Sequence, residues 1–64
     1  MKQNFQIGDI ILPIHYPKES IYYGYISDIS HNKDRYYNIT VIFFDQEVNN
    51  NFGLFNESQL TKIS

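Results

Sequence analysis

The chain has 64 residues and no cysteine, so it has room for one domain (1–64) and excludes disulfides, thiolate metal sites and a cysteine nucleophile. Its formal net charge is −2 with a single arginine, which disfavours nonspecific nucleic-acid binding through clustered cations. It shows no signal peptide and no apolar segment of the ~20 residues that cross a bilayer, so we expect a cytoplasmic protein without a membrane partner.

Large apolar side chains are abundant. The chain has ten isoleucines, five phenylalanines and six tyrosines, but neither alanine nor tryptophan. A small all-β domain has one interior of limited volume, and these side chains exceed what it can bury. We therefore expect the surplus to form an exposed patch that another surface could cover.

The first predicted strand is 10–12, which follows a turn or bulge at Gly8. Two prolines then interrupt the chain, and proline cannot donate a backbone hydrogen bond within a sheet. Residues 13–20 are therefore predicted to form a loop, with His15 and Tyr16 at its tip.

A second strand is predicted over 21–30. Its isoleucines depart from strict alternation, which indicates a bulge near 27–28. Gly24 leaves room for a neighbouring backbone or an aromatic ring. The polar residues 31–35 have the character of a hairpin loop.

The stretch 36–45, YYNITVIFFD, is predicted as the central strand of the fold. It consists almost entirely of β-branched and aromatic residues and contains neither proline nor glycine. Strand alternation directs one uniformly large, apolar face into the core. The residues of that inward face are Tyr37, Ile39, Val41 and Phe43.

Three short elements and a turn complete the chain. The consecutive asparagines within 46–51 tolerate left-handed turn conformations. Residues 52–55 are predicted as a strand, 56–59 as a single 3₁₀ turn, and 60–63 as the last strand. Five strands, with turn signals about every ten residues, favour a sandwich or a barrel.

The pattern of residues resembles the Tudor-type SH3-like barrel over most of the chain. The positions that produce the resemblance are Phe5, Ile7, Gly8, Asp9, Tyr22, Gly24, Ile26, Ile29, Ile39, Val41, Phe43, Asp45, Phe55 and Leu60. The resemblance implies an all-β fold, a five-stranded SH3-like (Tudor-like) barrel with a short 3₁₀ turn before the last strand.

The same resemblance implies an aromatic cage that holds a methylated lysine or arginine by cation–π attraction. Tyr16, or His15, would supply one wall of the cage and Tyr22 another. Gln46 stands where the family usually has an aromatic residue, and the asparagine that usually follows is displaced to Asn49. These departures argue against recognition of methylated lysine or arginine by this chain.

Catalytic and metal-binding motifs are lacking. His15 and His31 lie in different predicted loops, and neither has a second ligand at metal-binding spacing. Four carboxylates next to turns, those of Asp9, Asp28, Asp34 and Asp45, are explained by local bonds to backbone N–H groups. No nucleophile elbow or glycine-rich phosphate loop is present. We predict that the protein is not an enzyme and uses no cofactor or metal.

Aromatic and apolar residues on outward faces are the candidate binding residues, because such side chains bury large areas at small entropic cost. An alternative is that they pack across strands and stabilise the sheet. The predicted partner-binding residues are Tyr16, Tyr22, Tyr25, Tyr36, Ile42 and Phe44.

These residues favour a protein-interaction module, a small accessory or regulatory subunit that binds a partner protein through an aromatic outer face. One alternative is a nucleic-acid or ribonucleoprotein-associated binder of the SH3-like or KOW type, with Tyr22, Tyr36 and Phe44 as stacking platforms. A second alternative is a self-assembling structural protein, in which the surplus aromatics form a homo-oligomer interface.

Overall fold

The computed structural model describes residues 5–30 and 38–63. Five antiparallel strands form one open sheet, and these ranges contain no α-helix, which confirms the all-β prediction. The strands are β1 (Ile10–Pro13), β2 (Gly24–Ile29), β3 (Ile39–Phe43), β4 (Phe52–Phe55) and β5 (Leu60–Lys62). Three short 3₁₀ turns accompany them: η1 (Ser20–Tyr22), η2 (Val48–Asn51) and η3 (Glu57–Gln59).

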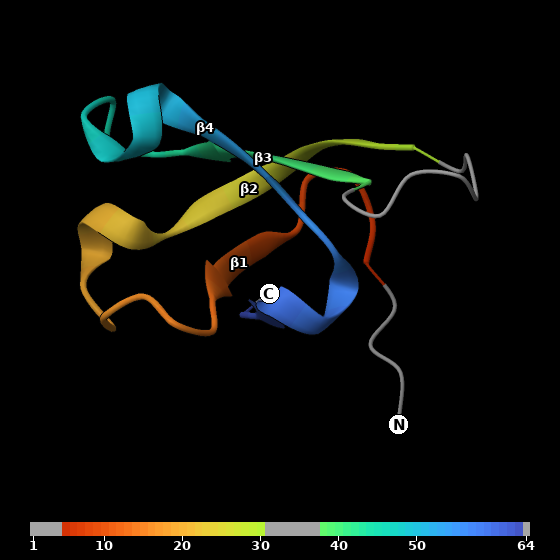
Figure 1. Ribbon diagram of the computed structural model, residues 1–64, viewed down its shortest axis with the longest axis horizontal. Helices are drawn as coiled ribbons and strands as arrows, with labels where there is room; N and C mark the ends of the chain where they lie inside the picture. The colour runs from red at the N-terminus through yellow and green to blue at the C-terminus, as the bar shows by residue number, and fades with distance from the viewer. Residues whose placement is uncertain (1–4, 31–37, 64) are drawn as a thin grey trace.

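The strand order is β4-β3-β2-β1-β5 (Figure 1). The stretch predicted as the central strand contributes β3, which pairs with β2 and β4, whereas β2 occupies the middle of the sheet. Strand β1 pairs with both β2 and β5, so the C-terminal strand lies beside the N-terminal one. Two strands therefore end the sheet, β4 on one side and β5 on the other.

Alternation along β3 sets the core. Ile39, Val41 and Phe43 are almost completely buried, as predicted, while Tyr37 lies outside the described residues. The cluster around them is entirely apolar, and no described residue that is polar or charged is buried. The buried cluster consists of Ile11, Ile26, Ile39, Val41, Phe43, Val48, Phe55 and Leu60.

Two predicted backbone features of β2 are confirmed. The β2–β3 register shifts between Ile26 and Asp28, which is the expected bulge. Gly24 lies against the backbone of the next strand, because a Cβ atom there would stand 2.6 Å from the Ile42 carbonyl oxygen. The close approach of the strands therefore requires glycine at this position.

The second strand begins later than predicted. Ser20–Tyr22 form η1, in which the Tyr22 N–H donates to the Glu19 carbonyl at 3.0 Å. The N–H of Tyr23 likewise donates to the Ser20 carbonyl at 3.3 Å. Because these donors are satisfied locally, sheet pairing starts only at Gly24.

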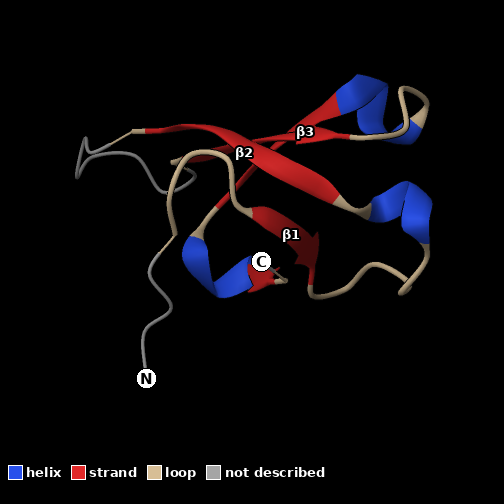
Figure 2. Ribbon diagram, turned by 180° about the vertical axis from the view of Figure 1, so that it is seen from behind, coloured by secondary structure: helices blue, strands red, loops and turns tan. Residues whose placement is uncertain are grey.

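The asparagine turn and the C-terminal elements agree with the predictions. Asn49, Asn50 and Asn51 have φ values of 48°, 57° and 80°, in the left-handed region. The predicted 52–55 strand is β4, and the 3₁₀ turn and the last strand follow as η3 and β5. The predicted hairpin loop 31–35 lies outside the described residues. Turns η1 and η2 lie at the same end of the sheet (Figures 1 and 2).

Candidate functional site

The predicted binding residues do not form one surface. Tyr16 and Tyr22 pack against the core cluster and line a pocket, whereas Tyr25 and Phe44 contact each other on the outer face of the sheet. Their ring centroids are 5.8 Å apart. Tyr36 lies outside the described residues. The described aromatic members of this set therefore fall into two groups, Tyr16 with Tyr22 and Tyr25 with Phe44.

Tyr22 was expected on the outward face of a strand, and its position in η1 is the reason for the difference. The turn directs its ring toward Tyr16, with centroids 5.4 Å apart and ring planes at 87°. Tyr22 and Phe44 consequently belong to different surfaces.

Tyr16 does not project from its loop. Its ring stacks on Phe43, with centroids 5.9 Å apart and planes 6° from parallel, and meets Phe55 edge-on at 6.4 Å. Such ring pairs contribute about 0.5–1.5 kcal/mol beyond their area burial. The loop between β1 and η1 is thus fixed to the core at Tyr16, while its neighbour His15 is exposed. This loop spans 14–19 rather than the predicted 13–20, because Pro13 belongs to β1 and Ser20 to η1.

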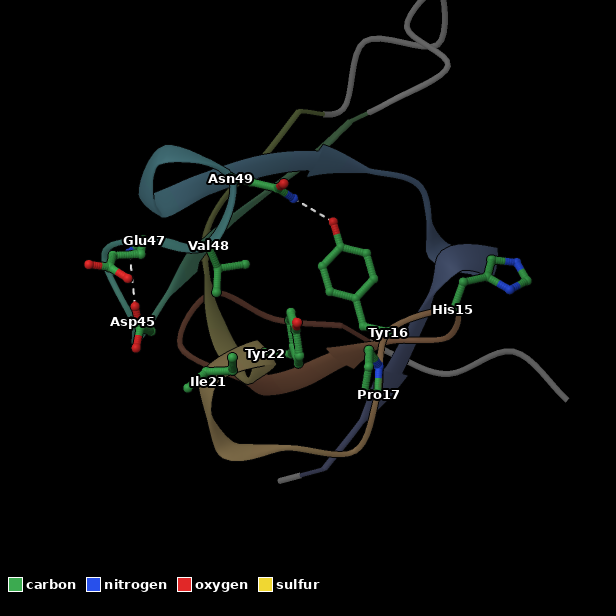
Figure 3. Close-up of a pocket in the computed structure, with 9 residues that line it drawn as sticks. All are labelled: His15, Tyr16, Pro17, Ile21, Tyr22, Asp45, Glu47, Val48 and Asn49. Carbon is green, nitrogen blue, oxygen red and sulfur yellow. Dashed lines mark hydrogen bonds between the residues drawn. The ribbon is translucent and has the colours of Figure 1, made fainter.

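These two tyrosines lie in the middle of a pocket of about 620 Å³ (Figure 3). The pocket is at the end of the sheet where both η1 and η2 lie (Figure 1). Three separate segments of the chain provide its walls. The lining residues are His15, Tyr16, Pro17, Ile21, Tyr22, Asp45, Glu47, Val48 and Asn49.

The polar side of the pocket carries two carboxylates. The Asp45 Oδ1 atom accepts the backbone N–H of Glu47 at 2.9 Å, which fixes the acidic turn after β3. Asn49, in the left-handed turn, donates its side-chain amide to the Tyr16 hydroxyl. Among the described residues, no lysine or arginine lines the pocket, and the two lining side chains with a formal charge, Asp45 and Glu47, are both negative. His15 lies on the opposite side from the carboxylates in Figure 3.

Sequence reasoning treated Asp45 only as a turn residue and did not place Glu47 or Val48 in a site. The one available signal was the acidic turn directly after a buried strand. Local pattern could not show that this turn faces Tyr16 and Tyr22, because those residues are more than twenty positions away in the chain.

The outer face of the sheet carries a row of apolar side chains. Residues Ile10, Tyr25, Ile42 and Phe52 lie directly opposite one another on four adjacent strands. Phe44 flanks this row and is 56% exposed, and Leu54 on β4 is 52% exposed. We call Ile10, Tyr25, Ile42, Phe44, Phe52 and Leu54 the outer patch.

Other chemistry-bearing residues are dispersed over the part of the chain that the structure describes. In residues 5–30 and 38–63, no three histidine, cysteine or acidic side chains gather where they could hold a metal ion. Asp9 accepts the backbone N–H of Gln6 at 2.7 Å and pairs with the Lys62 ammonium at 3.4 Å. The local role predicted for Asp9 and Asp45 is thereby confirmed.

Within the described ranges, none of the helical segments has the length and apolar character that a membrane span requires. No protein-family model, curated protein or solved structure matches the chain. The residues and their geometry therefore provide the basis for a functional proposal.

Proposed function

We propose that the chain is a non-enzymatic protein-interaction module and that its pocket receives a basic side chain of the partner protein. One observation supports this most directly. Two tyrosine rings at right angles, Tyr16 and Tyr22, share a pocket with the carboxylates of Asp45 and Glu47. Aromatic faces and carboxylates both attract cations.

The fold that we propose for this module is the SH3-like (Tudor-like) barrel. The antiparallel order β4-β3-β2-β1-β5 supports it, as does the 3₁₀ turn η3 directly before the last strand. The bulge in β2 supports it as well, because bulges bend a strand and increase its twist, and closure into a barrel requires such curvature.

The pocket suits a long side chain with a cationic end. Pro17, Ile21 and Val48 provide apolar contact for an alkyl stem. One ring contributes about 1 kcal/mol to a cation and an exposed carboxylate less than that. Together they give about 1.5 kcal/mol, which is roughly a 10-fold preference for a basic over a neutral side chain.

An unmodified lysine or arginine fits these walls better than a methylated one. A quaternary ammonium has no N–H to donate and depends on several aromatic faces. Here Gln46 follows the acidic turn where a further ring would be needed, and the available groups are hydrogen-bond acceptors. We therefore expect N–H donation to Asp45 or Glu47 to add to the cation–π contact.

An NMR titration of the ¹⁵N-labelled protein with short Gly/Ser peptides tests the proposal. The peptides carry paired lysines, arginines, trimethyl-lysines or glutamates. We expect shift changes around Tyr22 and Val48 with lysine and arginine peptides, weaker ones with trimethyl-lysine, and none with glutamate. Tighter binding of the trimethyl-lysine peptide would contradict the preference for an unmodified cation.

Single and double substitutions distinguish peptide binding in the pocket from binding elsewhere on the surface. Tyr22→Ala, and Asp45→Asn combined with Glu47→Gln, should each weaken binding of the basic peptide about 3- to 5-fold. Tyr25→Ala is the matched control, because it truncates the same residue type on the outer patch. The proposal fails if basic peptides do not bind, or if Tyr25→Ala weakens binding as much as Tyr22→Ala.

A further inference from the structure

Among the described residues, strand β4 ends the sheet without charged residues, proline or a bulge of its own. Natural edge strands carry charged residues, proline or bulges that prevent pairing with another chain. Strand β4, Phe52-Gly53-Leu54-Phe55, has none of these, and asparagines precede and follow it. The opposite edge, β5, carries Lys62, which pairs with Asp9 at 3.4 Å.

The side chains of β4 also leave apolar surface exposed next to this edge. Phe52 and Leu54 are each about half exposed, at 51% and 52%. A fully exposed aromatic side chain presents 150–250 Å², so Phe52 alone leaves roughly 100 Å² in contact with water. Both residues belong to the outer patch, which therefore runs across the sheet to the β4 edge.

From these observations we infer that β4 pairs antiparallel with β4 of a second copy of this chain, across a two-fold axis. In an antiparallel pair, residues directly opposite each other share one face. With Gly53 opposite Gly53 of the second copy, Phe52 faces Leu54 of that copy. The two outer patches then become one continuous row of apolar side chains.

The second copy fits this edge for reasons of symmetry and charge. The pairing is isologous, so it closes at two copies. No charged residue lies in β4, so no like charges face each other across the strands. Asn51 and Asn56 flank the strand, so neutral amides adjoin the pairing at both ends.

The size of the contact sets the strength of the dimer. A four-residue strand pair with two half-exposed apolar side chains buries on the order of 500 Å² per copy, below the ~800 Å² of a standard interface. We therefore expect a dimer that forms reversibly, with a Kd of roughly 10–100 μM. No β4 residue lines the pocket, so dimer formation does not depend on the proposed peptide-binding function.

Sedimentation velocity over about 5 μM to 1 mM protein tests the inference. The mass should rise with concentration from 7.6 kDa toward twice that value. Leu54→Lys should weaken dimerisation at least ~10-fold by placing a charge on the edge. Phe44→Lys is the matched control, because it adds the same charge to the outer patch away from β4 and should leave the dimer intact.

Amide hydrogen exchange of the wild type provides a second measurement if Leu54→Lys does not fold. Protection of amides in β4 should increase with protein concentration, while protection in β5 should not. A monomer at 1 mM overturns the inference, as does growth beyond two copies. Loss of the dimer in Phe44→Lys would mean that the copies pack face to face, and concentration-dependent protection in β5 would mean head-to-tail pairing; either result also overturns it.

Discussion

Gly24→Ala tests the close approach of β2 and β3. A Cβ atom at this position would stand 2.6 Å from the Ile42 carbonyl oxygen and 2.9 Å from Cγ1 of Val41. Ordinary carbon–oxygen contacts between strands are about 3.3–3.6 Å. The strands must therefore separate by roughly 0.7 Å or more where Gly24 faces Phe43.

The expected loss of stability follows from the kind of atom that the added Cβ would contact, which is a backbone carbonyl oxygen. Overpacking typically costs about 1–3 kcal/mol, and a clash with backbone cannot be relieved by rotating a side chain. We expect a loss of about 3 kcal/mol, which lowers the Tm by about 12–24 °C in a domain of this size. This is a large part of the 5–15 kcal/mol that stabilises a typical domain.

Thermal and urea unfolding followed by circular dichroism measure the effect, with Gly53→Ala as the matched control. A Cβ atom on Gly53 would meet the Phe55 ring at 2.7 Å, and a ring edge can shift where a carbonyl cannot. Gly53→Ala should therefore lose less stability than Gly24→Ala. The packing argument is refuted if Gly24→Ala has the same Tm as the wild type, or if it loses less stability than Gly53→Ala.

Substitutions at two further positions test the inward face of β3 and the left-handed asparagine turn. Val41→Asp should unfold the domain, because Val41 is fully buried among apolar residues that offer a carboxylate no partner; a folded spectrum by NMR would contradict the inward face of β3. Asn50→Asp should change stability by less than about 0.5 kcal/mol, since the side chain is exposed and Asp tolerates a φ of 57°. Asn50→Val should lose about 1–2 kcal/mol in the same melts, because a β-branched side chain is strained at that φ, and equal melting of the two variants would contradict the turn geometry.

The pocket and the outer patch are next to each other at the end of β3, where Phe43 is the last residue of the strand and Phe44 follows it. Phe43 points into the core and stacks on Tyr16, which forms a wall of the pocket. Phe44 points outward and contacts Tyr25 on the outer patch. Because side chains alternate along an extended chain, a single-residue step separates the pocket from the outer patch. Variants at Tyr22 and Leu54 should therefore have separable effects.

The sequence by itself determined the features that depend on local backbone preferences. Alternation identified Ile39, Val41 and Phe43 as inward-facing, because successive side chains of a strand point to opposite faces. The asparagine run indicated a left-handed turn, because asparagine tolerates positive φ better than most residues. The bulge in β2 was visible as a break in that alternation.

Only the tertiary structure decided where the site lies. The pattern of residues placed Tyr22 on a strand, whereas local hydrogen bonds form η1 and direct its ring toward Tyr16. The carboxylates of Asp45 and Glu47 reach the same pocket from a turn more than twenty residues along the chain. The proximity of these carboxylates to the two tyrosines depends on tertiary contacts, such as the packing of the Tyr16 loop on Phe43. Long-range contacts of this kind leave no periodic signal in the sequence.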